Sequence, residues 1–267
     1  MGAVNSKVAV TAVLLLVAGL AGCGDNSHGT QAHDGSAGSE QPADRYRHTV
    51  ADALGSSWPA NAEPVDQLDS VPTRENIMVV LDMSGSMASK TCSGTYRNKA
   101  EAARAVLGDW VNEVDPEANL GLVVFDADGV TVRTPLGQHN REHFIDKINQ
   151  SRPIGGTPLR SAIELALEQL EYRSAHQQGY GDYRIMVITD GEHSNGEDPA
   201  VPLNRIFSNP SDPTQVHTVG FCIDDSALNQ PGLTVYQSAE NPEELRDGLN
   251  RVLAESASFE NIEDFDG

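Results

Sequence analysis

Residues 77–86, with the sequence Ile-Met-Val-Val-Leu-Asp-Met-Ser-Gly-Ser, decide the fold of this chain. Residues 77–81 form an uninterrupted apolar run between polar residues, which is typical of a strand buried on both faces of a sheet. Oxygen-bearing side chains follow this run at Asp82, Ser84 and Ser86. Because ligands of open α/β sheets bind beyond the carboxyl ends of the strands, this cluster predicts a binding site at that edge.

Strand patterns alternate with helix patterns over the rest of the folded part. The predicted strands cover residues 77–81, 120–125, 130–132, 185–188, 216–221 and 233–236. The predicted helices cover residues 96–114 and 142–149 and begin again near Thr157 and Asn241. Asp128-Gly129 predicts a hairpin turn before an antiparallel edge strand. This alternation predicts an α/β fold, a three-layer doubly wound and mostly parallel sheet with helices on both faces.

Two further segments place oxygen ligands at the same edge of the predicted sheet. Residues 155–159 read Gly-Gly-Thr-Pro-Leu, where we expect Thr157 to cap a helix that has Pro158 in its first position. Asp190 follows directly after another buried strand, in Ile188-Thr189-Asp190-Gly191. Hydroxyl and carboxylate oxygens suit a hard divalent cation such as Mg²⁺ or Mn²⁺. The three segments together therefore predict one metal site.

This set of residues resembles the metal-ion-dependent adhesion site of von Willebrand factor A domains. The resemblance covers roughly residues 75–255, and we expect the domain itself over residues 74–255. It implies that Ser84, Ser86 and Thr157 bind the ion through their hydroxyls, with Thr157 binding directly when the site is engaged. It also implies that Asp82 and Asp190 act mostly through water and fix the two serines.

The same resemblance implies a binding function. Three neutral hydroxyls leave the ion electrophilic, with one coordination position that a Glu or Asp of another protein fills. The expected cofactor is Mg²⁺, or else Mn²⁺ or Ca²⁺. A protein partner that presents such a carboxylate is expected, and the chain is not expected to be an enzyme.

The first residues resemble a bacterial lipoprotein signal. Residues 8–21 are an uncharged run of signal-peptide length, and Leu20-Ala21-Gly22-Cys23 resembles a lipobox. This implies that residues 1–22 are cleaved and that Cys23 carries lipid; an ordinary signal peptide with a chance cysteine is the alternative. A cell-envelope protein is expected, and in a Gram-negative bacterium Gly24 favours the outer membrane because it replaces the aspartate that signals inner-membrane retention.

The segments on either side of the expected domain differ from it in composition. Residues 23–44 are polar and rich in Gly and Ser, so they predict a flexible tether. Residues 45–73 form an N-terminal extension that we expect to lie against the domain, and residues 256–267 form an acidic tail.

Two cysteines remain after lipidation of Cys23. Cys92 follows the first site loop and Cys222 lies near the end of a late strand, so both are expected near one edge of the sheet. An exported compartment permits disulfides, and we hypothesise a Cys92–Cys222 bridge. Two free thiols are the alternative.

The chain is strongly acidic, with a formal net charge of −21. Such a chain repels nucleic acid and anionic lipid surfaces, so no nucleic-acid partner is expected. Further acids are expected on the rim of the site at Asp126, Glu192, Glu197, Asp198, Asp224 and Asp225. They favour a partner whose metal-binding carboxylate lies inside a basic patch, unless they serve only to keep the protein soluble.

Two rival functions remain open. A metal-dependent hydrolase would need a general base, for which His193 is the best candidate, although a solvated loop histidine is the simpler interpretation. An assembly scaffold would bind its partner through residues 45–73 and use its metal only structurally.

Overall fold

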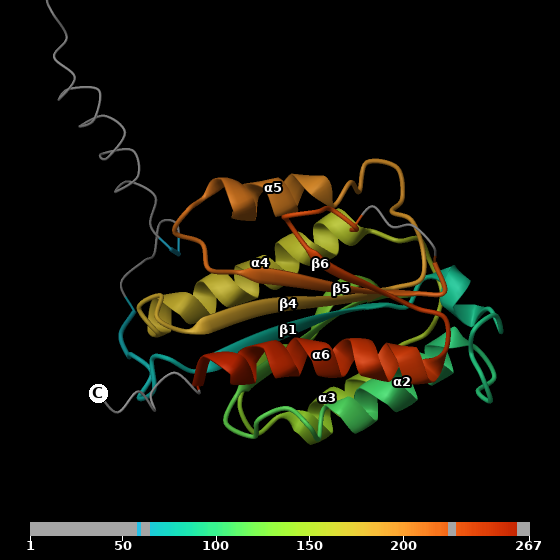
Figure 1. The fold of residues 1–267 in the computed structure, drawn as a ribbon, viewed down its shortest axis with the longest axis horizontal. Coiled ribbons are helices and arrows are strands. Elements are labelled where there is room, and N and C mark those ends of the chain that lie inside the picture. The colour runs from blue at the N-terminus through green and yellow to red at the C-terminus, as the bar shows by residue number, and fades with distance from the viewer. Residues whose placement is uncertain (1–57, 60–64, 224–227, 261–267) are drawn as a thin grey trace, which may run out of the picture.

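The computed structural model describes residues 58–59, 65–223 and 228–260, which form a sheet covered by helices on both faces (Figure 1). The six strands lie in the order β3-β2-β1-β4-β5-β6. Their bounds are β1 Glu75–Asp82, β2 Asn119–Asp126, β3 Gly129–Gly137, β4 Asp182–Thr189, β5 Gln215–Phe221 and β6 Val235–Ala239. β3 is antiparallel to β2, and the other pairs are parallel. The predicted three-layer, mostly parallel α/β fold and its antiparallel edge hairpin are confirmed.

The helices divide the hydrophobic core into two layers. On one face of the sheet lie α4 (Leu159–His176) and α5 (Ala200–Ser208), and on the other lie α2 (Lys99–Trp110), α3 (Arg141–Gln150) and α6 (Pro242–Glu260) (Figure 1). Side chains of a strand alternate between faces, so Met78 and Val80 pack towards α4 while Val79 and Leu81 pack towards α2. Because both faces are covered, β1 is a continuous apolar run instead of an alternating one.

Several element boundaries differ from the predicted ones. α2 covers Lys99–Trp110 instead of residues 96–114, and it begins where the Asn98 side chain accepts a hydrogen bond from the Glu101 amide. β6 covers Val235–Ala239 instead of residues 233–236. α6 extends past residue 255 into the segment that was predicted to be an acidic tail.

No helix was predicted for residues 200–208, where the structure has α5. The first turn of α5 contains Pro202, and Pro199 lies just before it. Proline is compatible with the first turn of a helix because the amides there have no intrahelical acceptor. The side chain of Asp198 accepts a hydrogen bond from the Ala200 amide at 2.9 Å and so supports this start.

The amino-terminal ends of the strands hold a closed polar network. Asn76 is fully buried, and its amide nitrogen donates to the carbonyl oxygen of Arg74, the side-chain oxygen of Gln177 and the carbonyl oxygen of Asp182. Its side-chain oxygen accepts from the amide of Asn119 at 2.8 Å. Every polar atom of the Asn76 side chain thus has a partner within the fold.

A buried arginine completes this amino-terminal end. The guanidinium of Arg184 is 1% exposed and forms ion pairs with Glu75, at 2.6 Å, and with Asp182. The described part of the N-terminal extension packs nearby, since Trp58 meets the Tyr183 ring edge-on, with ring centroids 5.7 Å apart. Asp69 also forms an ion pair with Arg173 at 3.2 Å. The buried charge at this end of the sheet is therefore compensated by side chains of the protein itself.

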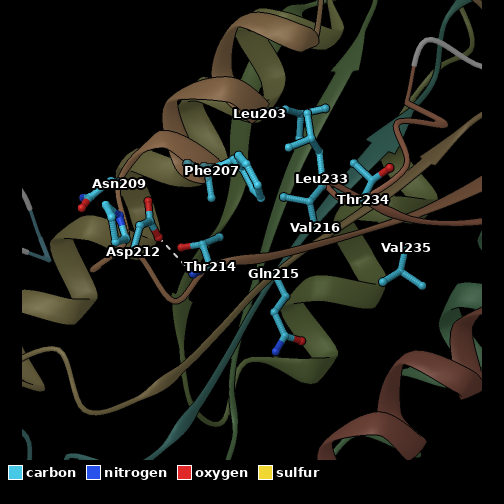
Figure 2. Close-up of a pocket in the computed structure, with 13 residues that line it drawn as sticks. Leu203, Phe207, Asn209, Asp212, Thr214, Gln215, Val216, Leu233, Thr234 and Val235 are labelled. Atoms are coloured by element: carbon cyan, nitrogen blue, oxygen red, sulfur yellow. Dashed lines mark hydrogen bonds between the residues drawn. The ribbon is translucent and has the colours of Figure 1, made fainter.

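A hollow of about 550 Å³ lies between α5, the start of β5 and the segment before β6 (Figure 2). Leu203 and Phe207 of α5 face Val216 and Leu233 across it, with Asp212 and Thr214 at one end. None of its lining residues belongs to the predicted metal site. Over residues 58–59, 65–223 and 228–260, the structure contains no helix of the length and apolar character needed to cross a bilayer.

Candidate metal centre

The carboxyl ends of β1 and β4 bring the two predicted carboxylates together. Asp82 is the last residue of β1, and Asp190 directly follows β4, the strand paired with β1 in parallel. The Thr189 hydroxyl donates to Asp82 Oδ2 at 2.7 Å, which ties the ends of the two strands to each other. Both aspartates are buried, so the parallel register places two acids beneath the same edge.

Hydrogen bonds join the first and third predicted segments. Asp82 Oδ1 accepts from the amide of Ser84 at 2.7 Å, which orders the turn after β1. The hydroxyl oxygens of Ser84 and Ser86 lie 2.9 Å apart, and Ser86 donates to Asp190 Oδ1 at 2.6 Å. The two serines therefore lie between the two carboxylates.

Hydrogen bonds hold the loop that carries Thr157 next to the turn that contains Ser84 and Ser86. The Gly85 amide donates to the carbonyl oxygen of Gly155 at 3.0 Å, and the Thr157 amide donates to Ser194 Oγ at 2.9 Å. A methyl group built on Gly191 would lie 3.7 Å from Ser86 Oγ and 3.9 Å from Thr157 Oγ1. The Thr157 and Ser86 hydroxyls thus flank the same small space, and glycine at 191 leaves it open.

The chemistry of these donors fits a hard divalent cation. Burial, and after it the charge of Asp190, raises the pKa of Asp82 to about 6, although hydrogen bonds from Ser84 and Thr189 oppose the shift. A cation beside two buried carboxylates would relieve this unfavourable charge. The described residues contain no cluster of three or more His, Cys, Asp or Glu side chains that could hold a metal, so this centre depends on its hydroxyls.

Comparison with known proteins identifies the fold family. Residues 77–193 match the family described as von Willebrand factor type A domain, a range that contains all five predicted site residues. The chain is also 30% identical over 162 residues to the uncharacterized protein YwmD of Bacillus subtilis, covering 56% of this chain and 69% of that protein. This chain belongs to the von Willebrand factor type A family.

Other proteins are similar to this chain in sequence or in fold. Mouse inter alpha-trypsin inhibitor heavy chain 4 is 25% identical over 211 residues, but the chain spans only 22% of that protein. The structure of BatB from Bacteroides thetaiotaomicron superposes with a TM-score of 0.54 at 18% identity, covering 68% of this chain and 98% of that one. Proximal thread matrix protein 1 of the mussel byssus, solved with zinc in its MIDAS motif, gives 0.54 at 16% identity, covering 71% and 48%. These structures share the fold of the A domain.

Lys99 is a residue of the A-domain site that the sequence analysis missed. Its ammonium forms an ion pair with Asp190 Oδ2, and the Lys99 side chain is 7% exposed. Lys99 is the first residue of α2, where the positive end of the helix disfavours a basic side chain. The available signal was a lysine in the first turn of the helix that follows the predicted metal-binding loop.

The structure corrects the expected acidic rim. Asp126 is buried and accepts from Arg133 at 2.7 Å, so its charge is neutralised within the domain. Glu192 and Asp198 are exposed as expected, and Asp198 also accepts from the amide of Ala200 at the start of α5. Asp224 and Asp225 lie outside the described residues. Asp126 therefore does not add free negative charge to the rim.

The predicted helix cap at Thr157 is wrong. α4 begins at Leu159, after Pro158, and no side chain at the capping position accepts a hydrogen bond. Glu197 takes over this role, because its carboxylate accepts from the amide and the hydroxyl of Ser161, both at 2.9 Å. The Thr157 hydroxyl is therefore not committed to the helix.

The hypothesised disulfide is confirmed. Cys92 and Cys222 are bridged, with Cα atoms 5.9 Å apart, and the bond ties the loop before α2 to the end of β5. The candidate base His193 has its ring Nδ1 3.0 Å from the carbonyl oxygen of Ser194, a contact within its own loop. Cys23, the expected lipidation site, lies outside the described residues.

Proposed function

We propose that this chain is a cell-envelope lipoprotein whose A domain binds another protein through a divalent cation. Ser84, Ser86 and Thr157 would hold the ion, with Asp82 and Asp190 supporting them. The ion is Mg²⁺, or Mn²⁺ or Ca²⁺ in its place. One carboxylate of the partner completes the coordination shell, and the domain captures its ligand without catalysing a reaction.

One observation carries this proposal: the hydroxyls of Ser84 and Ser86 contact each other beside two buried carboxylates, with the Thr157 hydroxyl next to Ser86. The Ser84 amide donates to Asp82, and the Ser86 hydroxyl donates to Asp190. Neutral hydroxyls reduce the charge of an ion less than carboxylates would. The ion therefore keeps a strong attraction for an external acidic group.

The rim supports a partner with basic groups around its carboxylate. Glu192 is exposed beside Asp190, and the chain carries a formal net charge of −21. A partner surface with only acids would be repelled, so a metal-binding Glu or Asp within a basic patch is favoured. Binding should then weaken as the salt concentration rises.

Metal binding is tested with purified protein and Mn²⁺ as the probe. Thr157→Val removes one hydroxyl at nearly constant volume, and Asp190→Asn removes one charge. We expect each to weaken Mn²⁺ binding by about tenfold or more, measured by isothermal titration calorimetry. Thr91→Val, at an exposed threonine on a nearby loop, is the matched control. Wild-type affinity in both site variants would refute the proposed site.

Partner binding and anchoring need separate tests. Cross-linking on intact cells, followed by purification in Mg²⁺ or in EDTA, should recover a partner that EDTA releases and that Thr157→Val does not retain. Cys23→Ser should move the protein from the membrane fraction to the soluble fraction. Retention of the partner in EDTA would favour the alternative scaffold that binds through residues 45–73.

A further inference from the structure

We propose that Lys99 is a built-in counter-cation of the metal centre, which holds Asp190 when no divalent ion is bound and weakens the binding of that ion. This inference rests on the proposed metal site and adds a residue that sets its affinity. The ammonium of Lys99 pairs with Asp190 Oδ2, while Ser86 donates to Oδ1 of the same carboxylate. Asp190 therefore lies between a protein cation and the proposed ion ligands.

Burial makes this pair different from an ordinary surface salt bridge. The side chain of Lys99 is 7% exposed and that of Asp190 is 0% exposed, so water screens the two charges poorly. Lysine is almost never buried unless it is paired. Lys99 also lies in the first turn of α2, where the helix dipole opposes its charge. The carboxylate of Asp190 compensates both costs.

The surrounding loop holds Lys99 in place. The Lys99 amide donates to the carbonyl oxygen of Ser89 at 2.8 Å, and Cys92, which is bridged to Cys222, lies between these two residues in the chain. Ser93 adds hydrogen bonds to the carbonyl oxygens of Lys90 and Tyr96, both at 2.9 Å. These contacts fix the backbone at Lys99, so its ammonium can move away from Asp190 only by rotation of the side chain.

Two effects follow for an entering divalent ion. It must share Asp190 with a positive charge that is already there, and it is repelled by that charge across a poorly hydrated space. Both effects lower the affinity of the site for the ion alone. A carboxylate from a partner restores negative charge at the site, so the ion and the partner are expected to bind cooperatively.

The test compares Mn²⁺ binding to the purified wild-type protein with binding to Lys99→Met and Lys99→Gln. Both substitutions remove the charge, and glutamine keeps a hydrogen-bond donor for Asp190. We expect each to tighten Mn²⁺ binding by about tenfold or more, equivalent to about 1.4 kcal/mol. Lys90→Met makes the same change of charge at an exposed lysine on the same loop and should leave the affinity within about twofold, since exposed charges are screened.

A second measurement follows unfolding by urea in EDTA and in Mn²⁺. Both Lys99 variants should be less stable than wild type in EDTA and gain more stability from Mn²⁺, because the positive charge of Lys99 no longer compensates the buried carboxylates. A variant that folds only after Mn²⁺ is added supports the proposal in the same way.

The outcomes separate the two proposals. Mn²⁺ binding to wild type with equal or weaker binding to both Lys99 variants would overturn the counter-cation role and leave the metal site intact. An absence of Mn²⁺ binding in wild type and in every variant would overturn the metal site itself. Binding that appears only when Lys99 is replaced would support both.

Discussion

The buried polar groups at the two ends of the central strands differ in how their charges are compensated. At the amino-terminal end, Arg184 is neutralised by Glu75 and Asp182, and Asn76 has partners for all its polar atoms. At the carboxyl-terminal end, the buried acids Asp82 and Asp190 accept hydrogen bonds from hydroxyls and from the Ser84 amide, and Lys99 forms an ion pair with Asp190.

The electrostatic preferences of these two ends are also opposite. Burial, and after it the charge of Arg184, lowers the pKa of His217 to about 4, so the amino-terminal end disfavours an added positive charge. Burial and then Asp190 raise the pKa of Asp82 to about 6, so the carboxyl-terminal end disfavours an added negative charge. One end is closed by the fold, whereas the other is suited to an external cation. This difference separates the structural polar residues of the sheet from those of the proposed metal site.

The largest expected effect concerns how the carboxyl-terminal end is held. The Cys92–Cys222 bond closes a loop with a sequence separation of 130, so replacing both cysteines by serine should lower the free energy of unfolding by about 4–5 kcal/mol in the chain-entropy model. Urea unfolding at pH 7.5 measures this change. A loss below about 1 kcal/mol would show that the polar contacts of the site hold this end without the cross-link.

Removing the buried cation at the amino-terminal end should lower the free energy of unfolding slightly less than removing the disulfide. Arg184→Met should lower the free energy of unfolding by about 3–4 kcal/mol, because Glu75 and Asp182 lose their cation and the 1% exposed site loses its hydrogen bonds. Arg205→Met, which removes a half-exposed arginine paired with Glu171, is the control and should cost at most about 1 kcal/mol. Mn²⁺ binding should survive in both variants; its loss in Arg184→Met would mean that the two ends are not independent.

The amino-terminal end should also lose stability in acid through His217. Its folded pKa of about 4 lies below the ordinary value of 6.5, so between these pH values the unfolded chain binds the proton and the folded chain does not. Stability from this residue is present above pH 6.5 and is lost as the pH falls towards 4, by about 3 kcal/mol. Unfolding curves of wild type and His217→Gln across this range should diverge accordingly, with exposed His143→Gln as the control. Parallel curves for wild type and His217→Gln would contradict the assignment.

The smallest effect should have the opposite sign. Asp82→Asn should raise the free energy of unfolding by about 1–2 kcal/mol in EDTA at pH 7.5, because it removes a buried charge whose pKa is raised. The gain should vanish below about pH 4, where the wild-type carboxyl is protonated as well. The same variant should lose Mn²⁺ binding, and exposed Asp109→Asn is the control. A destabilised Asp82→Asn would place Asp82 with the structural polar residues of the other end.

Much of the fold was predictable because its signals are local. The apolar run at residues 77–81 and the hairpin turn at Asp128-Gly129 each predict their element from neighbouring residues alone. α5 was missed because prolines in and before its first turn resemble a loop. The Thr157 cap was wrong for a different reason, since the acceptor for the start of α4 is Glu197, a residue from a later loop.

Short segments were enough to predict which strands are buried and which oxygen-bearing side chains end them, because periodicity and strand ends are local properties. Which charges pair depends on the three-dimensional fold. Lys99 pairs with Asp190 across 91 positions, and Asp126 is neutralised by Arg133 from the neighbouring strand. Electrostatic energy depends on distance in space and on exclusion of water, and neither can be read from separation along the chain.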